Sequence, residues 1–584
     1  MQKGGSFLTE QTTMEEIFTP EDFTEEHEMI AEITSNFVEK KVMPHLTEME
    51  NHDFTVARRL MKEAGELGLL STDIPEIYGG MGLDKISTAV ISEKMAAAGG
   101  FSVTHSAHIG IGSLPIVLFG NKRQKEKYLP ELATGEKIAS YALTEPTAGS
   151  DAVSVKTTAT LNKEGTHYIL SGEKQWITNS GIAEIFIVYA KVDKEHFTAF
   201  IVEKKFDGVS IGKEERKLGI KSSSTCAVRL DQVYVPVENV LGEVGKGHLI
   251  AFNILNIGRF KLGIGAVGAS KEALKKTISY TNNRKQFSTP ISQFPLTQEK
   301  FATMSTYIYA AESSVYRTAG FLSNSMDSLA IDEEFKTMAK TINEYVVECS
   351  INKVFASEVL DMVVDECVQL HGGNGFMEDF DITRMYRDSR INRIFEGTNE
   401  INRLLIPGTL LKKSMKGDLP LLVLASKMEK EAFSFIPFEP EWKPLSPEKM
   451  LLSNARNIVY MLLGIAAKKY QQTLEQQQEI LANMANIVSA IYNMDSCILR
   501  TEKARKVSSN EESLKVLYTE IYCQEAFQGV VSEATDTLSF MLSGDELRLA
   551  LSVLKKYSRY TPKSMILLKR EVAKELLKAG EYIV

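Results

Sequence analysis

The stretch AEIFIVYAKV, residues 183–192, decides the fold class of this chain. β-Branched and aromatic residues fill it, as is typical of a strand, and the same composition returns in FTAFIVE (197–203) and AVRLDQVYVP (227–236). Turn residues separate these runs. We therefore predict a β domain over residues 138–245, set between two helical regions.

Helical patterns lie on both sides of this β domain. An N-terminal helical domain is expected over residues 1–137, where Thr19 and Pro20 suit the N-cap and first position of a helix that continues to about Val42. Helical periodicity returns in long segments over 246–412. Three more N-terminal helices are expected near residues 54–67, 84–98 and 121–134.

The chain continues beyond the second helical region. Breaks at 412–420 and 433–447 carry Lys and Pro residues and mark a linker. Apolar residues at helical spacing follow over 448–584, a pattern typical of core packing. We therefore predict an appended helical domain over 413–584. The fold class is then mainly α with a central β domain.

The composition excludes several classes of function. The net charge is −9 and the pI is near 5.7, which argues against a nucleic-acid surface. No GxGxxG follows a predicted strand, so any nucleotide is not held by a Rossmann unit. The five cysteines form no CxxC pair and no histidine stands at metal-ligand spacing, so we expect no disulfide framework and no metal site.

The same features predict a cytoplasmic protein. Scattered cysteines suit a reducing compartment. The N-terminus lacks the apolar segment of a secretory signal. The longest apolar run, 458–467, is far shorter than a membrane span.

The stretch RIFEGTNEINR (393–403) contains a candidate catalytic group, Glu396. Thr398 is a good N-cap for a helix over 399–411, so Glu396 could be a surface acid near the positive end of that helix. A carboxylate next to Ile394 and Phe395 could instead be poorly solvated, and its raised pKa would make it a usable base. These eleven residues alone favour the surface acid.

Four other stretches combine Gly, Thr, Ser and Trp in a way that suits a planar cofactor with phosphates. They could also be an ordinary polar turn, a buried Trp, a solvated basic helix end and a glycine helix stop. The stretches are YALTEPTAGSDA (141–152), GEKQWITNSG (172–181), TNNRKQFSTPISQF (281–294) and VQLHGGNGF (368–376).

Taken together, in this order and at these separations, the stretches resemble the acyl-CoA dehydrogenases. The resemblance runs from about residue 20 to 412 and includes IPEIYGG, QKEKYLPELATGE, LGIKSSST, VPVENVLGE and NIGRFKLGIGAVG as well. The appended domain and the exact residues of ILNIGRF and RIFEGTNEI look most like the very-long-chain branch of this family. With so many agreeing motifs, Glu396 is identified as the catalytic base.

The resemblance implies the reaction. Members of the family oxidise a fatty acyl-CoA to the trans-2-enoyl-CoA, the first step of β-oxidation, with FAD as cofactor and electron-transfer flavoprotein as acceptor. Glu396 would take the α-proton, its backbone N–H would polarise the thioester carbonyl, and the β-hydride would pass to the flavin. Gly397 would let the backbone lie close to the substrate.

The resemblance also implies binding residues. CoA contacts carry over to Ser150, Asn256 and Arg259. FAD contacts carry over to Tyr141, Leu143, Thr144, Ser150, Trp176, Ile177, Thr178, Thr398 and Glu400, and those that would reach the FAD of a neighbouring subunit to Arg284, Phe287, Gln369, Gly372 and Gly373. Three departures affect this set: Ser288 replaces a common glycine, Pro295 replaces a glutamine that helps hold FAD in shorter-chain relatives, and Asn256 replaces a common acid.

The implied architecture is an N-terminal helical domain, a β-barrel-like middle domain, a C-terminal four-helix bundle and one appended helical domain. Because some FAD contacts would come from a second subunit, the site requires an oligomer. In relatives with the appended domain, that domain occupies the surface that other members use to form tetramers, so the resemblance implies a homodimer.

Two rival functions remain open from the sequence. An acyl-CoA oxidase would use the same base and flavin, but such chains usually run longer and differ around TEPTAGSD. A scaffold that kept the fold would lack FAD or would show no bleaching of the flavin by substrate.

The length of the acyl chain that the protein prefers is also open, since GGFSVTHSAHIGIGS (99–113) permits a deep, long-chain pocket without showing one. AAKKYQQ (466–472) gives only a hint of membrane-surface association.

Overall fold

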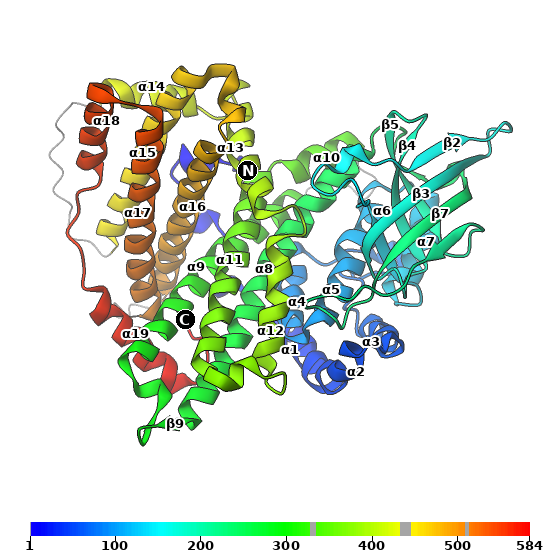
Figure 1. Cartoon of the computed structure of the whole chain (residues 1–584), viewed down its shortest axis with the longest axis horizontal. Helices are drawn as coiled ribbons and strands as arrows, with labels where there is room; N and C mark the ends of the chain where they lie inside the picture. Colours follow the sequence, from blue (N-terminus) through cyan, green and yellow to red (C-terminus); the bar gives the residue numbers. More distant parts are fainter. Residues whose placement is uncertain (1, 327–334, 432–444, 508–512) are drawn as a thin grey trace.

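The computed structural model describes residues 2–326, 335–431, 445–507 and 513–584. Long helices form the centre of the molecule, with the β domain on one side and the appended helices on the other (Figure 1). The break expected at 433–447 lies outside the described residues as far as 444.

The N-terminal region begins with short 3₁₀ turns before its first α-helix. Residues Pro20–Asp22 form only a short 3₁₀ turn capped by Thr19, and the first α-helix begins at Glu25 with Thr24 as its N-cap. The helix start expected at Thr19 is therefore wrong, because Phe23 adopts an extended ψ of 133° between the two elements. The helices are α1 (Glu25–Phe37), α2 (Leu46–Glu50), α3 (Phe54–Glu66), α4 (Lys85–Met95), α5 (Gly100–Ser106), α6 (Leu114–Phe119) and α7 (Lys122–Ala133).

The middle domain is one sheet in the order β6-β7-β3-β2-β4-β5-β8, with β1 paired in parallel to β4. Strand β4 carries the stretch that decided the fold class, and it is buried along nearly its whole length. The strands are β1 (Ala139–Ala142), β2 (Thr158–Leu161), β3 (His167–Thr178), β4 (Ile185–Val192), β5 (His196–Glu203), β6 (Val209–Ile211), β7 (Thr225–Pro236) and β8 (Val240–Leu241).

Four long helices form the bundle after the sheet, and α11 contacts the other three. They are α8 (Gly247–Asn283), α9 (Pro295–Met326), α11 (Val346–His371) and α13 (Asn399–Met415). Shorter elements join them: the hairpin β9 (Lys285–Gln286) and β10 (Thr289–Pro290), α10 (Phe335–Asn343) and α12 (Asp381–Ser389). Helix α13 ends inside the predicted break at 412–420.

The appended helices pack against the bundle through α9 and α13. Buried ion pairs join the two parts, Arg317 to Asp495 at 2.9 Å and Arg500 to Glu312 at 2.6 Å. Phe7 also lies in this core, so the first residues of the chain pack with the appended helices and not with the rest of 1–137. The helices are α14 (Leu421–Glu431), α15 (Ser446–Tyr470), α16 (Gln478–Val507), α17 (Leu514–Met541), α18 (Gly544–Tyr557) and α19 (Met565–Ala579).

In the part of the chain that the structure describes, three helical stretches are long and apolar enough to cross a membrane by length and composition alone. The uninterrupted apolar run 458–467 therefore underestimates how many residues of the chain could span a membrane by length and composition. In Gly100–Phe119 and Gly247–Asn283, 78% of the most apolar window is buried inside the protein, and in Ser446–Tyr470 the share is 56%. Internal packing accounts for most of this apolar surface.

Candidate active site

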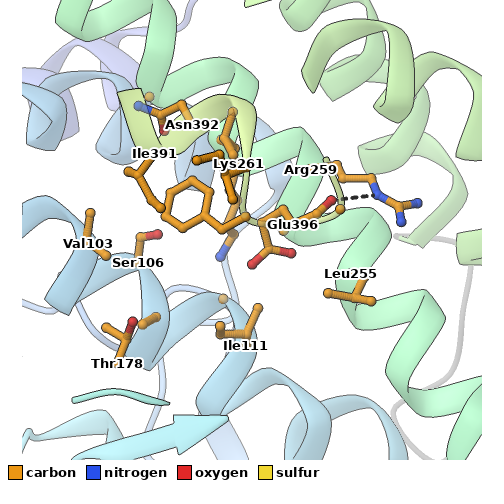
Figure 2. Close-up of a pocket in the computed structure, with 18 of the residues that line it drawn as sticks. Val103, Ser106, Ile111, Thr178, Leu255, Arg259, Lys261, Ile391, Asn392 and Glu396 are labelled. Atoms are coloured by element: carbon orange, nitrogen blue, oxygen red, sulfur yellow. Dashed lines mark hydrogen bonds between the residues drawn. The ribbon is translucent and has the colours of Figure 1, made fainter. Parts of the chain in front are cut away.

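A cavity of about 1310 Å³ opens where the N-terminal helices, the sheet and the bundle meet. Its walls include α4 and α5 on one side, α8 and α11 on another, and the end of β3. Glu396 lies in the wall, and its carboxylate is directed toward Ile111 and Leu255 (Figure 2). Among the described residues no group of three or more His, Cys, Asp or Glu side chains could hold a metal ion.

Glu396 sits in a turn just before α13. Its φ is +57° and that of Gly397 is +79°, so two successive residues adopt the left-handed conformation. For a residue other than glycine this conformation costs about 1–2 kcal/mol, so the surrounding contacts must hold it. Thr398 caps α13, because its Oγ1 accepts from the Ile401 N–H at 3.2 Å.

The carboxyl group of Glu396 is enclosed. Its Oε2 has no hydrogen-bond partner among the described residues. Burial raises the pKa of Glu396 to about 7, although the charges of Arg259 and Lys353 act to lower it. Glu396 therefore lies in the cavity wall and is not an acid on the outer surface of the protein. A carboxyl group with this pKa can accept a proton near neutral pH.

Groups from α8, α11 and α13 hold the turn. Arg259 Nε donates to Glu396 O at 3.2 Å, and Lys353 Nζ donates to Gly397 O at 2.8 Å. Asn402 Nδ2 donates to Gly397 O at 2.9 Å. Sequence reasoning assigned no role to Lys353 or Asn402, although Asn402 lies inside RIFEGTNEINR.

Gly258 makes room for the carboxylate. A Cβ at this position of α8 would lie 2.5 Å from Glu396 Oε2, closer than atoms can pack. Gly258 lies within the motif NIGRF, but nothing in the local sequence indicates this contact with Glu396.

Eight of the residues expected to contact FAD line the cavity. Trp176 is 61% exposed with φ +58°, because a bulge between Lys174 and Ile177 in β3 turns it out of the sheet. The ordinary buried Trp considered above is therefore wrong. Fully buried Lys174 supports the adjoining loop, pairing with Glu145 at 2.7 Å and donating to Leu143 O at 3.2 Å. The expected cofactor residues in the wall are Tyr141, Leu143, Thr144, Ser150, Trp176, Ile177, Thr178 and Thr398.

The expected CoA residues also line the cavity: Ser150, Asn256, Arg259 and Gly397. Arg259 is only 7% exposed, and besides Glu396 O its guanidinium donates to Asn256 Oδ1 at 2.8 Å. These bonds support the catalytic turn. A contact between Arg259 and an anionic group of CoA stays a prediction.

Six expected cofactor residues do not line this cavity. Five of them gather at the far ends of α8 and α11, which the stacked rings of Tyr280 and His371 hold together, 4.2 Å between centroids. Figure 1 shows β9 at this end, away from the sheet. Phe287 there is 92% exposed. The five are Arg284, Phe287, Gln369, Gly372 and Gly373, and the sixth, Glu400, lies exposed in the first turn of α13.

Family profiles of known proteins match most of the chain. Family profiles match residues 24–136 ("Acyl-CoA dehydrogenase, N-terminal domain"), 140–233 ("Acyl-CoA dehydrogenase, middle domain") and 245–411 ("Acyl-CoA dehydrogenase, C-terminal domain"). A further profile named "Acyl-CoA dehydrogenase, C-terminal domain" matches 454–556, in the appended helices.

Individual relatives agree. A "Probable acyl-CoA dehydrogenase" of Bacillus subtilis (strain 168) is 55% identical over 100% of this chain and 99% of its own. The mitochondrial very long-chain specific acyl-CoA dehydrogenase of Rattus norvegicus is 43% identical over 351 residues, which are 58% of this chain and 51% of that protein.

Two solved structures share the fold. An acyl-CoA dehydrogenase from Bacillus anthracis, complexed with FAD, covers both chains completely with a TM-score of 0.98 and 57% identity. Butyryl-CoA dehydrogenase from Megasphaera elsdenii covers 67% of this chain and 99% of its own, with a TM-score of 0.61 and 36% identity. With family profiles over most of its length and a relative that matches it from end to end, this chain belongs to the acyl-CoA dehydrogenase family.

Proposed function

We propose that the protein catalyses the FAD-dependent α,β-dehydrogenation of long-chain acyl-CoA to trans-2-enoyl-CoA, the first step of fatty acid β-oxidation, and passes the electrons to an electron-transfer flavoprotein. The observation that carries the proposal is the enclosed carboxyl group of Glu396, with a pKa raised to about 7, in the wall of a large cavity. Family membership supports the reaction class.

The residues present fit FAD. Trp176 exposes most of its side chain at the cavity, a Cβ at Gly149 would meet nothing within 4 Å, and the buried Tyr141 hydroxyl has no partner among the described residues. These groups would hold the flavin, together with Thr144, Ile177 and Thr178. When bound, FAD supplies the acceptor for the β-hydride.

The protein's own part in the chemistry is proton transfer. Glu396 takes the α-proton of the thioester, because its pKa lies near working pH and Gly258 leaves its carboxylate free to move toward the substrate. No hydrogen bond within the described residues uses the backbone N–H of Glu396, so it is free to donate to the thioester carbonyl as negative charge develops there. The apolar walls exclude water and keep the carboxylate basic.

The shape of the cavity supports a long acyl chain. Helix α8 lines the cavity with small residues from Gly265 onward, after the larger Lys261 and Leu262, and at Gly265 a Cβ would meet nothing within 4 Å. Ala269 also lines the wall, about 16 Å along the helix from Gly258 at a rise of ~1.5 Å per residue. An extended hydrocarbon advances about 1.25 Å per carbon, so this length accommodates roughly a dozen carbons beyond the reacting ones.

We also propose a homodimer in which each subunit completes the other's cofactor site. The expected FAD residues Arg284 and Phe287 are exposed and lie at the far end of α8 from their own cavity. Apolar side chains gather around them, with Leu296 76% and Phe376 84% exposed, as is typical of a protein–protein interface.

Membrane-surface association has no comparable support. A cytoplasmic location is proposed because all the cysteines are free and buried.

The test measures product and acceptor together. Purified protein is mixed with palmitoyl-CoA, either with electron-transfer flavoprotein or with oxygen alone, and enoyl-CoA and hydrogen peroxide are quantified. We expect enoyl-CoA that depends on the flavoprotein. Stoichiometric hydrogen peroxide with oxygen alone would instead identify an oxidase. Bound FAD without any enoyl-CoA would identify a scaffold.

A further inference from the structure

A fully buried lysine lies behind the turn that carries Glu396. Lys353, on α11, is 0% exposed, and its ammonium donates to Gly397 O at 2.8 Å and to Asn399 Oδ1 at 2.6 Å. Both acceptors belong to residues within three positions after Glu396. Among these residues Gly397 lines the cavity, whereas Lys353 does not. Lys353 therefore contacts the turn from behind and reaches the substrate only through it.

Packing alone does not explain a lysine here. In the described part of the chain its ammonium forms no ion pair, because both of its bonds go to neutral oxygens. Burying such a charge is unfavourable, and burial lowers the pKa of Lys353 to about 7, against the opposing effect of the Glu396 charge. An apolar side chain of similar size would avoid this cost. A cation at this position is therefore best explained by its effect on the neighbouring base.

We propose that Lys353 is a positioning residue that holds Glu396 and Gly397 in their left-handed conformation and supplies a positive charge behind the Glu396 carboxylate. This inference rests on the proposed function of Glu396 as the base.

The charged and titratable groups around the turn come from four elements. Arg259 is the other cation beside Glu396, and its bonds also go to neutral oxygens. Glu358 is paired with Arg403 at 2.8 Å. Lys353 is thus the cation of α11 that faces the base. Among the described residues these groups include Arg259 on α8, Cys349, Lys353 and Glu358 on α11, Glu400 and Arg403 on α13, and Tyr141 on β1.

Two substitutions separate charge from hydrogen bonding. Lys353→Gln keeps a donor for Gly397 O without the charge, and Lys353→Arg keeps the charge. The rate of flavin reduction by palmitoyl-CoA is measured against pH under anaerobic conditions. Because a cation stabilises the ionised base, the acid limb should move to higher pH in Lys353→Gln by about half a unit to one unit, and should stay near the wild-type position in Lys353→Arg.

A second readout does not depend on turnover. The infrared carboxyl band that Glu396→Gln removes is followed against pH in the FAD-loaded protein without substrate, and its midpoint should move in the same direction in Lys353→Gln. Lys271→Met is the matched control, because Lys271 is also largely buried but pairs with Glu93 and Glu312. It should lower thermal stability without moving either midpoint.

The outcomes are distinct. Unchanged midpoints in Lys353→Gln, or equal shifts in Lys353→Gln and Lys353→Arg, would overturn the role of Lys353 while leaving Glu396 as the base. Failure of the proposed function would show differently, as a wild-type protein whose flavin no acyl-CoA reduces.

Discussion

Replacing Gly265 by leucine should shorten the acyl chains that the protein oxidises. Gly265 lines the cavity, and a Cβ there would meet nothing within 4 Å, so a leucine side chain would enter open space. The position is seven residues beyond Gly258, which contacts the base, and hence about 10 Å along α8. The substituted side chain should therefore block a chain after roughly eight carbons, at about 1.25 Å per carbon.

The size of the effect follows from the buried methylenes. Palmitoyl-CoA has eight more carbons than octanoyl-CoA, and each methylene is worth about 0.8 kcal/mol when buried. A block roughly eight carbons beyond the reacting ones leaves about six methylenes of palmitoyl-CoA without their binding site. Losing the burial of these six removes about 5 kcal/mol of binding free energy, so kcat/KM for palmitoyl-CoA should fall by roughly 10³-fold. Octanoyl-CoA should keep its wild-type value within about threefold.

The assay is steady-state oxidation of even-numbered acyl-CoAs from butyryl-CoA to stearoyl-CoA. Gly529→Leu is the matched control, because Gly529 is also a helical glycine whose Cβ would meet nothing within 4 Å, but it lies on α17 away from the cavity. The reasoning fails if Gly265→Leu still oxidises palmitoyl-CoA at the wild-type rate. It also fails if all chain lengths lose activity equally, since the acyl chain would then not pass Gly265.

Three further predictions test the site. Gly258→Ala should slow flavin reduction about 10²-fold at unchanged FAD content, since its Cβ would lie 2.5 Å from Glu396 Oε2, and an unchanged rate would contradict the packing argument. Lys174→Met should leave buried Glu145 without its cation and destabilise the protein by about 3–5 kcal/mol, measured as a lower Tm and loss of FAD on gel filtration. The double variant with Glu145→Gln should recover most of the loss. Glu396→Gln should become more stable relative to wild type by about 3 kcal/mol between pH 4.5 and pH 8. The carboxyl pKa is 4.5 in the unfolded chain and about 7 in the folded one, so its stabilising effect is complete below pH 4.5 and is lost as the pH rises through 7. A Tm difference that does not change with pH would contradict the raised pKa.

Local sequence patterns could predict the parts of this fold whose cause is local. The runs over 183–192, 197–203 and 227–236 became β4, β5 and β7, because β-branched residues suit a buried sheet at every position. Thr398 could be predicted as the cap of α13, since capping involves only residues a turn apart. Cap residues alone could not distinguish Thr19 from Thr24, because both precede acidic residues that suit a first turn.

Features that depend on distant contacts could not be predicted in this way. Lys353 lies 43 positions before Glu396 in a helix of mixed polar and apolar residues, where nothing in the sequence separates it from a surface lysine. The exposure of Trp176 depends on a bulge in the pairing of β3 with β7. The packing of Phe7 against Tyr492 joins opposite ends of the chain. In each case the partner that determines the position is remote in sequence, and only the folded chain brings the two together.

The most direct test of the central claim is rapid anaerobic reduction of the flavin by palmitoyl-CoA in the wild type and in Glu396→Gln. Both proteins should be yellow, with equal FAD content and equal affinity for the substrate. The account predicts that the wild-type flavin bleaches rapidly and that the variant is at least about 10³-fold slower. A Glu396→Gln protein that bleaches at the wild-type rate would show that another group takes the α-proton, and the assignment of Glu396 as the base would be wrong.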